Sequence, residues 1–75
     1  MTHPALRTPI CDLFGIDVPI VQTGMGWVSG ARLTAATANA GGLGILASAT
    51  MTFAQLRTAI AEVKERAPGR SFGVN

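Results

Sequence analysis

The chain has 75 residues, of which 48% are hydrophobic and 13% are charged, and its formal net charge at pH 7 is +2. That composition is too apolar for a disordered segment, and the basic residues are mixed with acidic ones instead of forming a stripe, so no nucleic-acid partner is expected. A single cysteine and a single histidine exclude an internal disulfide and a metal cluster built on these residue types.

No membrane partner and no secretion signal are expected either. The uncharged stretch Val18–Ala31 is too polar and too rich in glycine for a membrane span. The first residues include Pro4 and Pro9 and form no apolar leader. These features predict a cytoplasmic protein.

The first predicted element is a short helix. Residues Met1–Arg7 are expected to form a loose end, after which Thr8 can cap a first turn and Pro9 suits the first helical position. Apolar residues at helical spacing continue to Phe14, and Gly15 is suited to ending the helix. The pattern predicts one or two turns.

A strand and a second helix follow. The segment Pro19–Thr23 predicts a buried strand, because β-branched residues dominate it and its proline stands at the start. Gly24 and Gly26 then allow a sharp turn or a close approach to something bound. Ser29 is expected to cap a helix over residues 31–40, whose alanines permit close packing on a sheet.

The last three elements are a strand, a helix and a strand. The apolar run Leu43–Ala47 does not alternate, which is typical of a strand buried on both faces. Thr52–Gln55 has the form of a capping box, and Ser71–Asn75 predicts a third strand. Between them, the apolar spacing predicts a helix whose buried face carries Phe53, Leu56, Ile60 and Val63.

This order predicts an α/β fold in which residues 1–75 form a single unit with parallel strands and right-handed crossovers. The carboxyl ends of parallel strands meet at one edge, which would carry residues 22–25, residues 47–49 and Asn75. That edge holds no carboxylate, histidine, lysine or cysteine, so no catalytic acid or base is assigned. It offers backbone amides, hydroxyls and carboxamides.

The glycine turn lies where nucleotide-binding motifs occur, between a predicted strand and a predicted helix. Ser29 stands where the third glycine of a dinucleotide fingerprint belongs, and no acidic residue follows the second strand. A P-loop is excluded because the chain has no Gly-Lys-Ser/Thr sequence. The residues alone leave two interpretations open, a plain tight turn and a turn in contact with a cofactor.

Three motifs resemble the nitronate monooxygenase family, formerly called 2-nitropropane dioxygenases. They are Pro19–Met25 (PIVQTGM), Ala38–Gly44 (ANAGGLG) and Phe72–Asn75 (FGVN), and they occur in the family's order. The same group includes FMN-dependent enoyl-acyl-carrier-protein reductases and flavin reductases that act on CoA thioesters. The resemblance extends over Thr8–Asn75.

The resemblance implies a (β/α)8 TIM barrel that binds FMN at the carboxyl ends of its strands, and this chain would supply the first three β/α units. It implies that Thr23, Gly24 and Met25 lie against the flavin and that Asn75 makes a polar contact to it. Family members usually have proline at the place of Gly24, which leaves the subgroup open.

Three functional expectations follow. The first is flavin-mediated oxidation of alkyl nitronates by O2, and the second is FMN-dependent reduction of enoyl or steroid-derived acyl thioesters, each with a small-molecule substrate. The third is an inactive truncated βα fragment, because a (β/α)8 barrel needs about 250 residues. An isolated 75-residue chain is then expected to be inactive, not to hold FMN tightly, and to self-associate through open sheet edges.

Overall fold

The fold is a three-stranded parallel sheet covered by helices. The computed structural model describes residues 4–75, and Met1–His3 of the predicted loose end lie outside the described residues. The strands lie in the order β1-β2-β3 and both pairs are parallel, which confirms the predicted α/β class. The elements are η1 (Pro4–Leu6, a 3-10 turn), α1 (Pro9–Phe14), β1 (Val21–Gln22), α2 (Ala31–Asn39), β2 (Leu43–Leu46), α3 (Phe53–Arg66) and β3 (Phe72–Val74).

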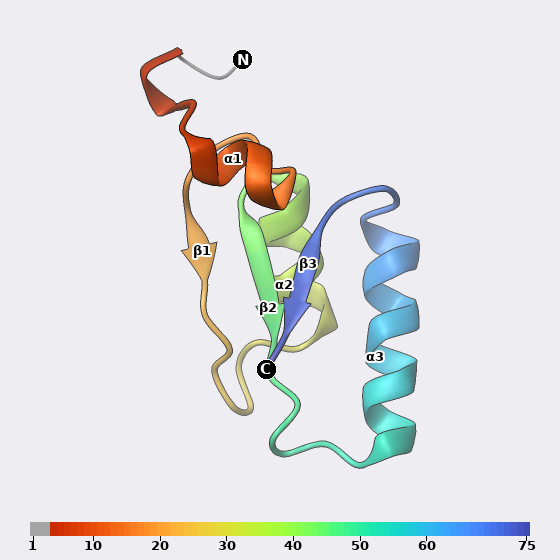
Figure 1. Ribbon diagram of the computed structural model, residues 1–75. Helices are drawn as coiled ribbons and strands as arrows, with labels where there is room; N and C mark the ends of the chain where they lie inside the picture. Colours follow the sequence, from red (N-terminus) through yellow and green to blue (C-terminus); the bar gives the residue numbers. More distant parts are fainter. Residues whose placement is uncertain (1–3) are drawn as a thin grey trace.

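Two small clusters of buried residues form the core, one beneath α1 and one between α2 and α3. Figure 1 shows α2 behind the sheet with α3 alongside, and α1 across the end where β1 and β2 begin. Cys11 and Ile16 pack with Leu43 beneath α1. The cluster between the other two helices contains Ala35, Ala38, Val63 and Ala67.

Local signals in the sequence set several helix ends as expected. Gly15 ends α1 in the left-handed region, with φ 67°. The capping box at α3 is present, since the hydroxyl of Thr52 accepts from the Gln55 N–H and the Gln55 side chain accepts from the Thr52 N–H. The Thr8 hydroxyl does not cap α1, because it lies beside the Cys11 sulfur instead. Helix starts are therefore set here by side-chain caps in one case and by proline in the other.

The close contact of α2 with β2 depends on Gly44. The strand is largely buried, as predicted for an apolar run without alternation. A Cβ atom on Gly44 would lie only 2.4 Å from the carbonyl oxygen of Thr34 in α2. The helix backbone thus packs directly against the strand backbone at this point.

The predicted buried face of α3 is confirmed at Val63, holds in part at Leu56 and Ile60, which are half-buried, and is wrong at Phe53. Ala59, Val63 and Ala67 face the core, whereas Phe53 is 90% exposed. The reason lies in α2, whose contact surface consists of alanines and admits a helix only at short distance, which favours small side chains on the partner. Val63 is the one predicted core residue of α3 that is fully buried.

The first strand is shorter and more exposed than the predicted Pro19–Thr23. Only Val21 and Gln22 join the sheet, and Val21 is 42% exposed. Within residues 4–75, β1 pairs with β2 alone and adds no residue to the core clusters. No helix in this part of the chain combines the length and apolar character needed to cross a bilayer.

Replacing Gly44 tests the backbone contact between α2 and β2. Gly44→Ala is expected to lower the free energy of unfolding by at least about 2 kcal/mol, because the new Cβ forces the helix away from the strand. Equilibrium denaturation of the protein, expressed from its complete reading frame, measures the change. Gly26→Ala is the control, since its Cβ would meet only Thr50 at an ordinary 3.6 Å. Equal losses in the two variants would contradict the proposed contact.

Candidate functional site

Asn75 follows β3 at the carboxyl edge of the sheet, where its main chain is held by hydrogen bonds and its side chain, within the described chain, is free. The N–H of Asn75 donates to the carbonyl of Leu46 at 2.9 Å, and its carbonyl accepts from the Ser48 N–H at 2.9 Å and the Ser48 hydroxyl at 2.5 Å. The Asn75 side chain is exposed and makes no hydrogen bond with residues 4–75. Its main chain is therefore fixed while its carboxamide stays available.

The turn after β1 reaches Asn75 across the end of β2. A Cβ on Gly24 would lie 3.1 Å from the Asn75 Cβ and 3.2 Å from its Nδ2. Since β2 separates β1 from β3 in the sheet, the chain after β1 must cross the end of β2 to make this contact. The structure thus brings together two segments that lie about fifty residues apart in the sequence.

The side chain of Gln22 ends the pairing of β1 with β2. The register pairs Gln22 with Gly44, so the next bond of a parallel ladder would run from the Gly24 N–H to the Ile45 carbonyl. Instead, Nε2 of Gln22 donates to that carbonyl at 3.1 Å and to the Thr23 carbonyl at 2.6 Å. The Gly24 N–H makes no hydrogen bond with the described residues.

Ser29 holds the turn in shape instead of capping α2, which corrects the sequence-based expectation. Gly30 is the N-cap of α2, and the buried Ser29 hydroxyl accepts from the Met25 N–H at 2.7 Å. The Met25 carbonyl in turn accepts from the N–H groups of Val28 and Ser29. The Ser29 carbonyl accepts from the Ala47 N–H at 3.0 Å, which fastens the turn to the end of β2.

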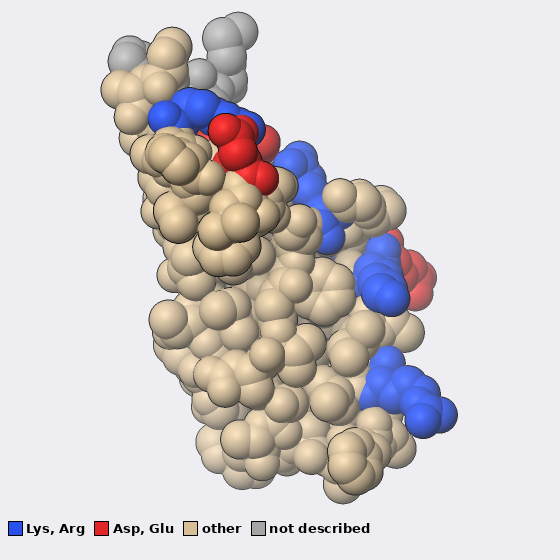
Figure 2. Space-filling view, in the orientation of Figure 1, with Lys and Arg blue, Asp and Glu red and all other residues tan. Residues whose placement is uncertain are grey.

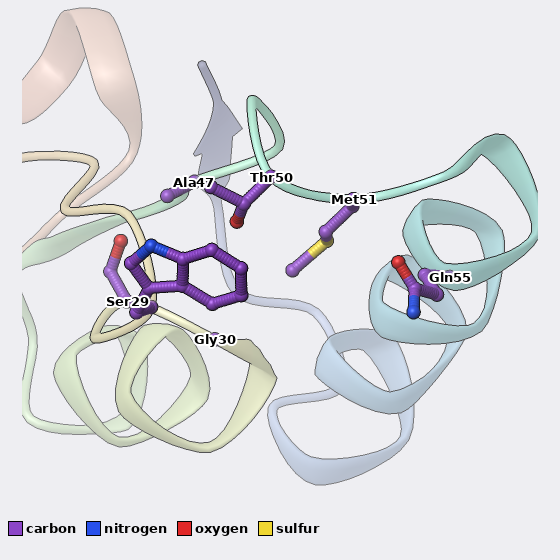
Figure 3. Close-up of a pocket in the computed structure, with 7 residues that line it drawn as sticks. Ser29, Gly30, Ala47, Thr50, Met51 and Gln55 are labelled. Atoms are coloured by element: carbon purple, nitrogen blue, oxygen red, sulfur yellow. The ribbon is translucent and has the colours of Figure 1, made fainter.

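A cavity of about 260 Å³ lies beside this turn. Trp27 adopts φ 66°, a conformation that costs a non-glycine residue roughly 1–2 kcal/mol, and its side chain is 89% exposed. Trp27 lines this cavity together with two residues of the loop that leads into α3, Thr50 and Met51, which Figure 3 labels. None of the cavity's lining residues is charged: they are Trp27, Ser29, Gly30, Ala47, Thr50, Met51 and Gln55.

Most charged side chains of the described chain lie over α1 or on the α3 side, and Arg32 is exposed in the first turn of α2, directly after the turn that follows β1. Figure 2 shows them over α1 and along the α3 side, whereas the face over β1 and its turn carries none in this view. They form exposed ion pairs, Arg7–Asp12, Arg70–Asp17 and Arg66–Glu62, the last at 2.7 Å. No cluster of three or more His, Cys, Asp or Glu side chains occurs among residues 4–75. The edge can therefore recognise an uncharged polar group, and it supplies no acid or base.

The predicted site residues are placed as follows. Gly24 and Asn75 are in contact, and Thr23 and Met25 flank Gly24 in the exposed turn. The Met25 N–H and the Thr23 carbonyl are already occupied, by the Ser29 hydroxyl and the Gln22 side chain. The sequence did not predict the roles of Ser29 and Gln22 in the turn. Their hydrogen-bond partners depend on the register of the sheet, which leaves no local signal in the sequence.

The sequence pattern of the family "Nitronate monooxygenase" matches residues 7–75. The chain belongs to the nitronate monooxygenase family. This confirms the resemblance carried by the three motifs.

Three relatives of this chain have names that state an activity. A "(3aS,4S,5R,7aS)-5-hydroxy-7a-methyl-1-oxo-octahydro-1H-indene-4-carboxyl-CoA dehydrogenase" of Mycobacterium tuberculosis (strain ATCC 25618 / H37Rv) is 66% identical over 93% of this chain and 19% of its own length. The Rhodococcus jostii (strain RHA1) protein of the same name is 60% identical over 93% of this chain and 20% of its own. A "Nitronate monooxygenase" of Paraburkholderia phytofirmans (strain DSM 17436 / LMG 22146 / PsJN) is 41% identical over 85% of this chain and 18% of its own.

The fold also matches a solved structure. FabK from Thermotoga maritima superposes with a TM-score of 0.86 and 43% identity, over 92% of this chain and 22% of that one. The chain thus spans about a fifth of the length of the proteins it matches.

Ser29→Ala tests how the turn is held. Loss of the hydroxyl leaves the Met25 N–H without its acceptor, and the free energy of unfolding is expected to fall by about 1–2 kcal/mol. Denaturant titration measures the loss, and Ser71→Ala is the matched control because Ser71 is exposed and its hydroxyl forms no hydrogen bond with residues 4–75. A Ser29→Ala protein as stable as the control would show that this bond does not hold the turn.

Proposed function

We propose that this chain belongs to an FMN-dependent oxidoreductase that dehydrogenates the CoA thioester of a hydroxylated fused-ring acid. The observation that carries the proposal is the difference in identity between two groups of relatives. Two dehydrogenases named for such a thioester are 66% and 60% identical, against 41% for the nitronate monooxygenase. This difference supports the acyl thioester, the second sequence-based expectation, over the nitronate, and the name dehydrogenase in both relatives supports oxidation of the thioester over its reduction.

The strand ends fit the uncharged ring edges of a flavin. The Asn75 carboxamide offers a donor and an acceptor, and the Gly24 N–H is a second donor without a partner in the described chain. Space beside the carboxamide exists because Gly24 has no Cβ, which would lie 3.1 Å from the Asn75 Cβ. A ring with alternating donors and acceptors along its edge is complementary to such groups.

Thr23, Gly24, Met25 and Asn75 are the residues proposed to face FMN, which would supply a two-electron acceptor for the hydrogen removed from the substrate. Their part is to bind and orient. Backbone fixed before the ligand arrives loses little entropy on binding, and hydrogen bonds fix the Asn75 main chain and the Met25–Ser29 turn on either side of the proposed donors. No acid or base stands at this edge in residues 4–75, so these residues do not move the substrate's proton.

The cavity beside the turn supports the choice of substrate. Its walls include the exposed ring of Trp27 and the side chain of Met51, and its polar groups are the hydroxyl of Thr50 and the amide of Gln55. An apolar wall with few polar groups suits an alicyclic ring that carries hydroxyl and oxo substituents. The phosphates of CoA would need cations, which this cavity lacks.

We also propose that the chain forms the first three β/α units of a (β/α)8 barrel. Support comes from the parallel order of its strands, from α1 lying across their amino ends, and from the superposition on about a fifth of FabK. Such a barrel carries its active site at the carboxyl ends of the strands, where the Gly24–Asn75 contact lies.

A substrate comparison tests the proposed function. The protein, purified from its complete reading frame, is expected to carry FMN. Under anaerobic conditions, the hydroxy-oxo-octahydroindene carboxyl-CoA thioester should bleach the flavin absorbance, whereas an alkyl nitronate should not. Bleaching by the nitronate with oxygen uptake on re-aeration, and none by the thioester, would favour the nitronate function. The absence of FMN would contradict both.

Asn75→Leu tests the proposed contact to the flavin. The variant keeps the size of the side chain and removes both polar atoms, so the dissociation constant for FMN is expected to rise about tenfold. Asn39→Leu is the matched control, because it removes a carboxamide whose Nδ2 donates to the Arg66 carbonyl at 2.9 Å between α2 and α3. The control should lose stability and keep its affinity. Equal affinities in both variants would remove Asn75 from the proposed site.

A further inference from the structure

We infer that Gln22 is a positioning residue that occupies Gly24's place in the sheet and so presents the Gly24 N–H as a free donor at the strand ends. The identity of the ligand that accepts this hydrogen bond, the ring edge of FMN, rests on the proposed function. The placement of the N–H itself rests only on contacts within residues 21–45.

The pairing of β1 stops after Gln22, where Gly24 favours a turn but neither a proline nor a bulge breaks the ladder. Thr23 is β-branched and suits a strand, no proline follows it, and no bulge interrupts the register Val21↔Leu43, Gln22↔Gly44. At the place of the next ladder bond, a side chain donates instead of the backbone. The Ile45 carbonyl, which the Gly24 N–H would reach in a continued ladder, already accepts from Nε2 of Gln22 at 3.1 Å.

The two hydrogen bonds of Nε2 fix the orientation of the Gln22 carboxamide and leave its oxygen without a partner in the described chain. Both N–H bonds of Nε2 are directed at carbonyls, those of Ile45 and Thr23, so the amide cannot be turned over without pointing its oxygen at two other oxygens. Its own Oε1 is buried and has no partner among the described residues. A buried unsatisfied acceptor destabilises the fold, so the position of the Gln22 side chain has a cost in stability.

The release of Gly24 has a direct consequence for the site. A backbone that continued the ladder would keep Gly24 beside Ile45, whereas the released peptide crosses the end of β2 and meets Asn75. A backbone donor and a carboxamide then stand side by side at an edge without charge. That pair recognises an acceptor next to another polar atom on an uncharged heteroaromatic ring, which matches the class of ring in a flavin.

A purely structural role for Gln22 makes a different prediction from a positioning role. If its two hydrogen bonds serve only stability, removing them lowers the melting temperature and leaves ligand affinity alone. If they hold Gly24 out of the ladder, removing them lets the Gly24 N–H bond to the Ile45 carbonyl. The melting temperature then changes little, because a backbone bond replaces the side-chain bond, and the ligand loses its donor.

The test compares Gln22→Met, Gly24→Pro and their double variant in the protein expressed from its complete reading frame. Met keeps the length of the side chain without donors, and Pro removes the N–H. Gly24→Ala is the matched control, since it adds the Cβ near Asn75 and keeps the N–H. We expect Gln22→Met to raise the dissociation constant for FMN about tenfold relative to the unchanged protein. We expect Gly24→Pro to raise it about tenfold relative to Gly24→Ala.

The double variant gives the sharpest result. Both changes remove the same hydrogen bond, so the FMN affinity of the double variant should fall about tenfold relative to Gly24→Ala. Independent effects would instead lower that affinity about a hundredfold. The visible spectrum of bound FMN should shift in Gln22→Met and Gly24→Pro alike. Multiplied losses, or a Gln22→Met protein with a lower melting temperature and unchanged FMN affinity, would overturn the inference.

A measurement without ligand separates this inference from the proposed function. Hydrogen–deuterium exchange of the apoprotein should show the Gly24 amide exchanging more slowly in Gln22→Met than in the unchanged protein, because it joins the ladder. The Gly24→Pro variant has no amide hydrogen at this position, so the signal that it lacks is identified as that of the Gly24 amide. Faster or unchanged exchange in Gln22→Met would overturn the positioning role, whatever the protein binds. Failure of the unchanged protein to bind FMN, with the exchange result as expected, would overturn only the proposed ligand.

Discussion

The contact between α2 and β2 exists because Gly44 has no side chain, and every part of the candidate site is attached to that same strand. β1 and β3 pair with its two sides. At its carboxyl end, Ala47 holds the carbonyl of Ser29 and Ser48 holds that of Asn75. The relative position of the glycine turn and the carboxamide is therefore set by one buried strand and not by the flexibility of the loops.

Local signals predicted much of this fold. Gly15, the capping box at Thr52 and the apolar run of β2 act through neighbours within a few residues, and the structure has all three. The buried face of α3 could not be predicted from its apolar pattern alone. Alanine adds little to an apolar pattern, yet in a close helix pair it is the side chain that fits, so Ala59 and Ala67 are buried while Phe53 is exposed.

The assignment of residues to the candidate site stays a prediction, and their arrangement could not be predicted from the sequence. The three motifs indicated Gly24 and Asn75, and the structure shows them in contact. Gln22 and Ser29 were not predicted to shape the turn, because whether a side chain or a backbone N–H reaches a given carbonyl depends on the sheet register. The substrate could not be read from the strand ends either, since uncharged groups serve both a thioester and a nitronate. The proposal of a thioester rests instead on the higher identity to the two dehydrogenases.

A crystal structure of the FMN-loaded protein is the most direct test of the idea that the turn after β1 and Asn75 together hold a flavin ring. The expected result is a ring heteroatom within about 3.2 Å of the Gly24 amide nitrogen and another within the same distance of the Asn75 carboxamide. A flavin bound away from these two residues, or a Gly24 N–H bonded to the Ile45 carbonyl with FMN present, would contradict it.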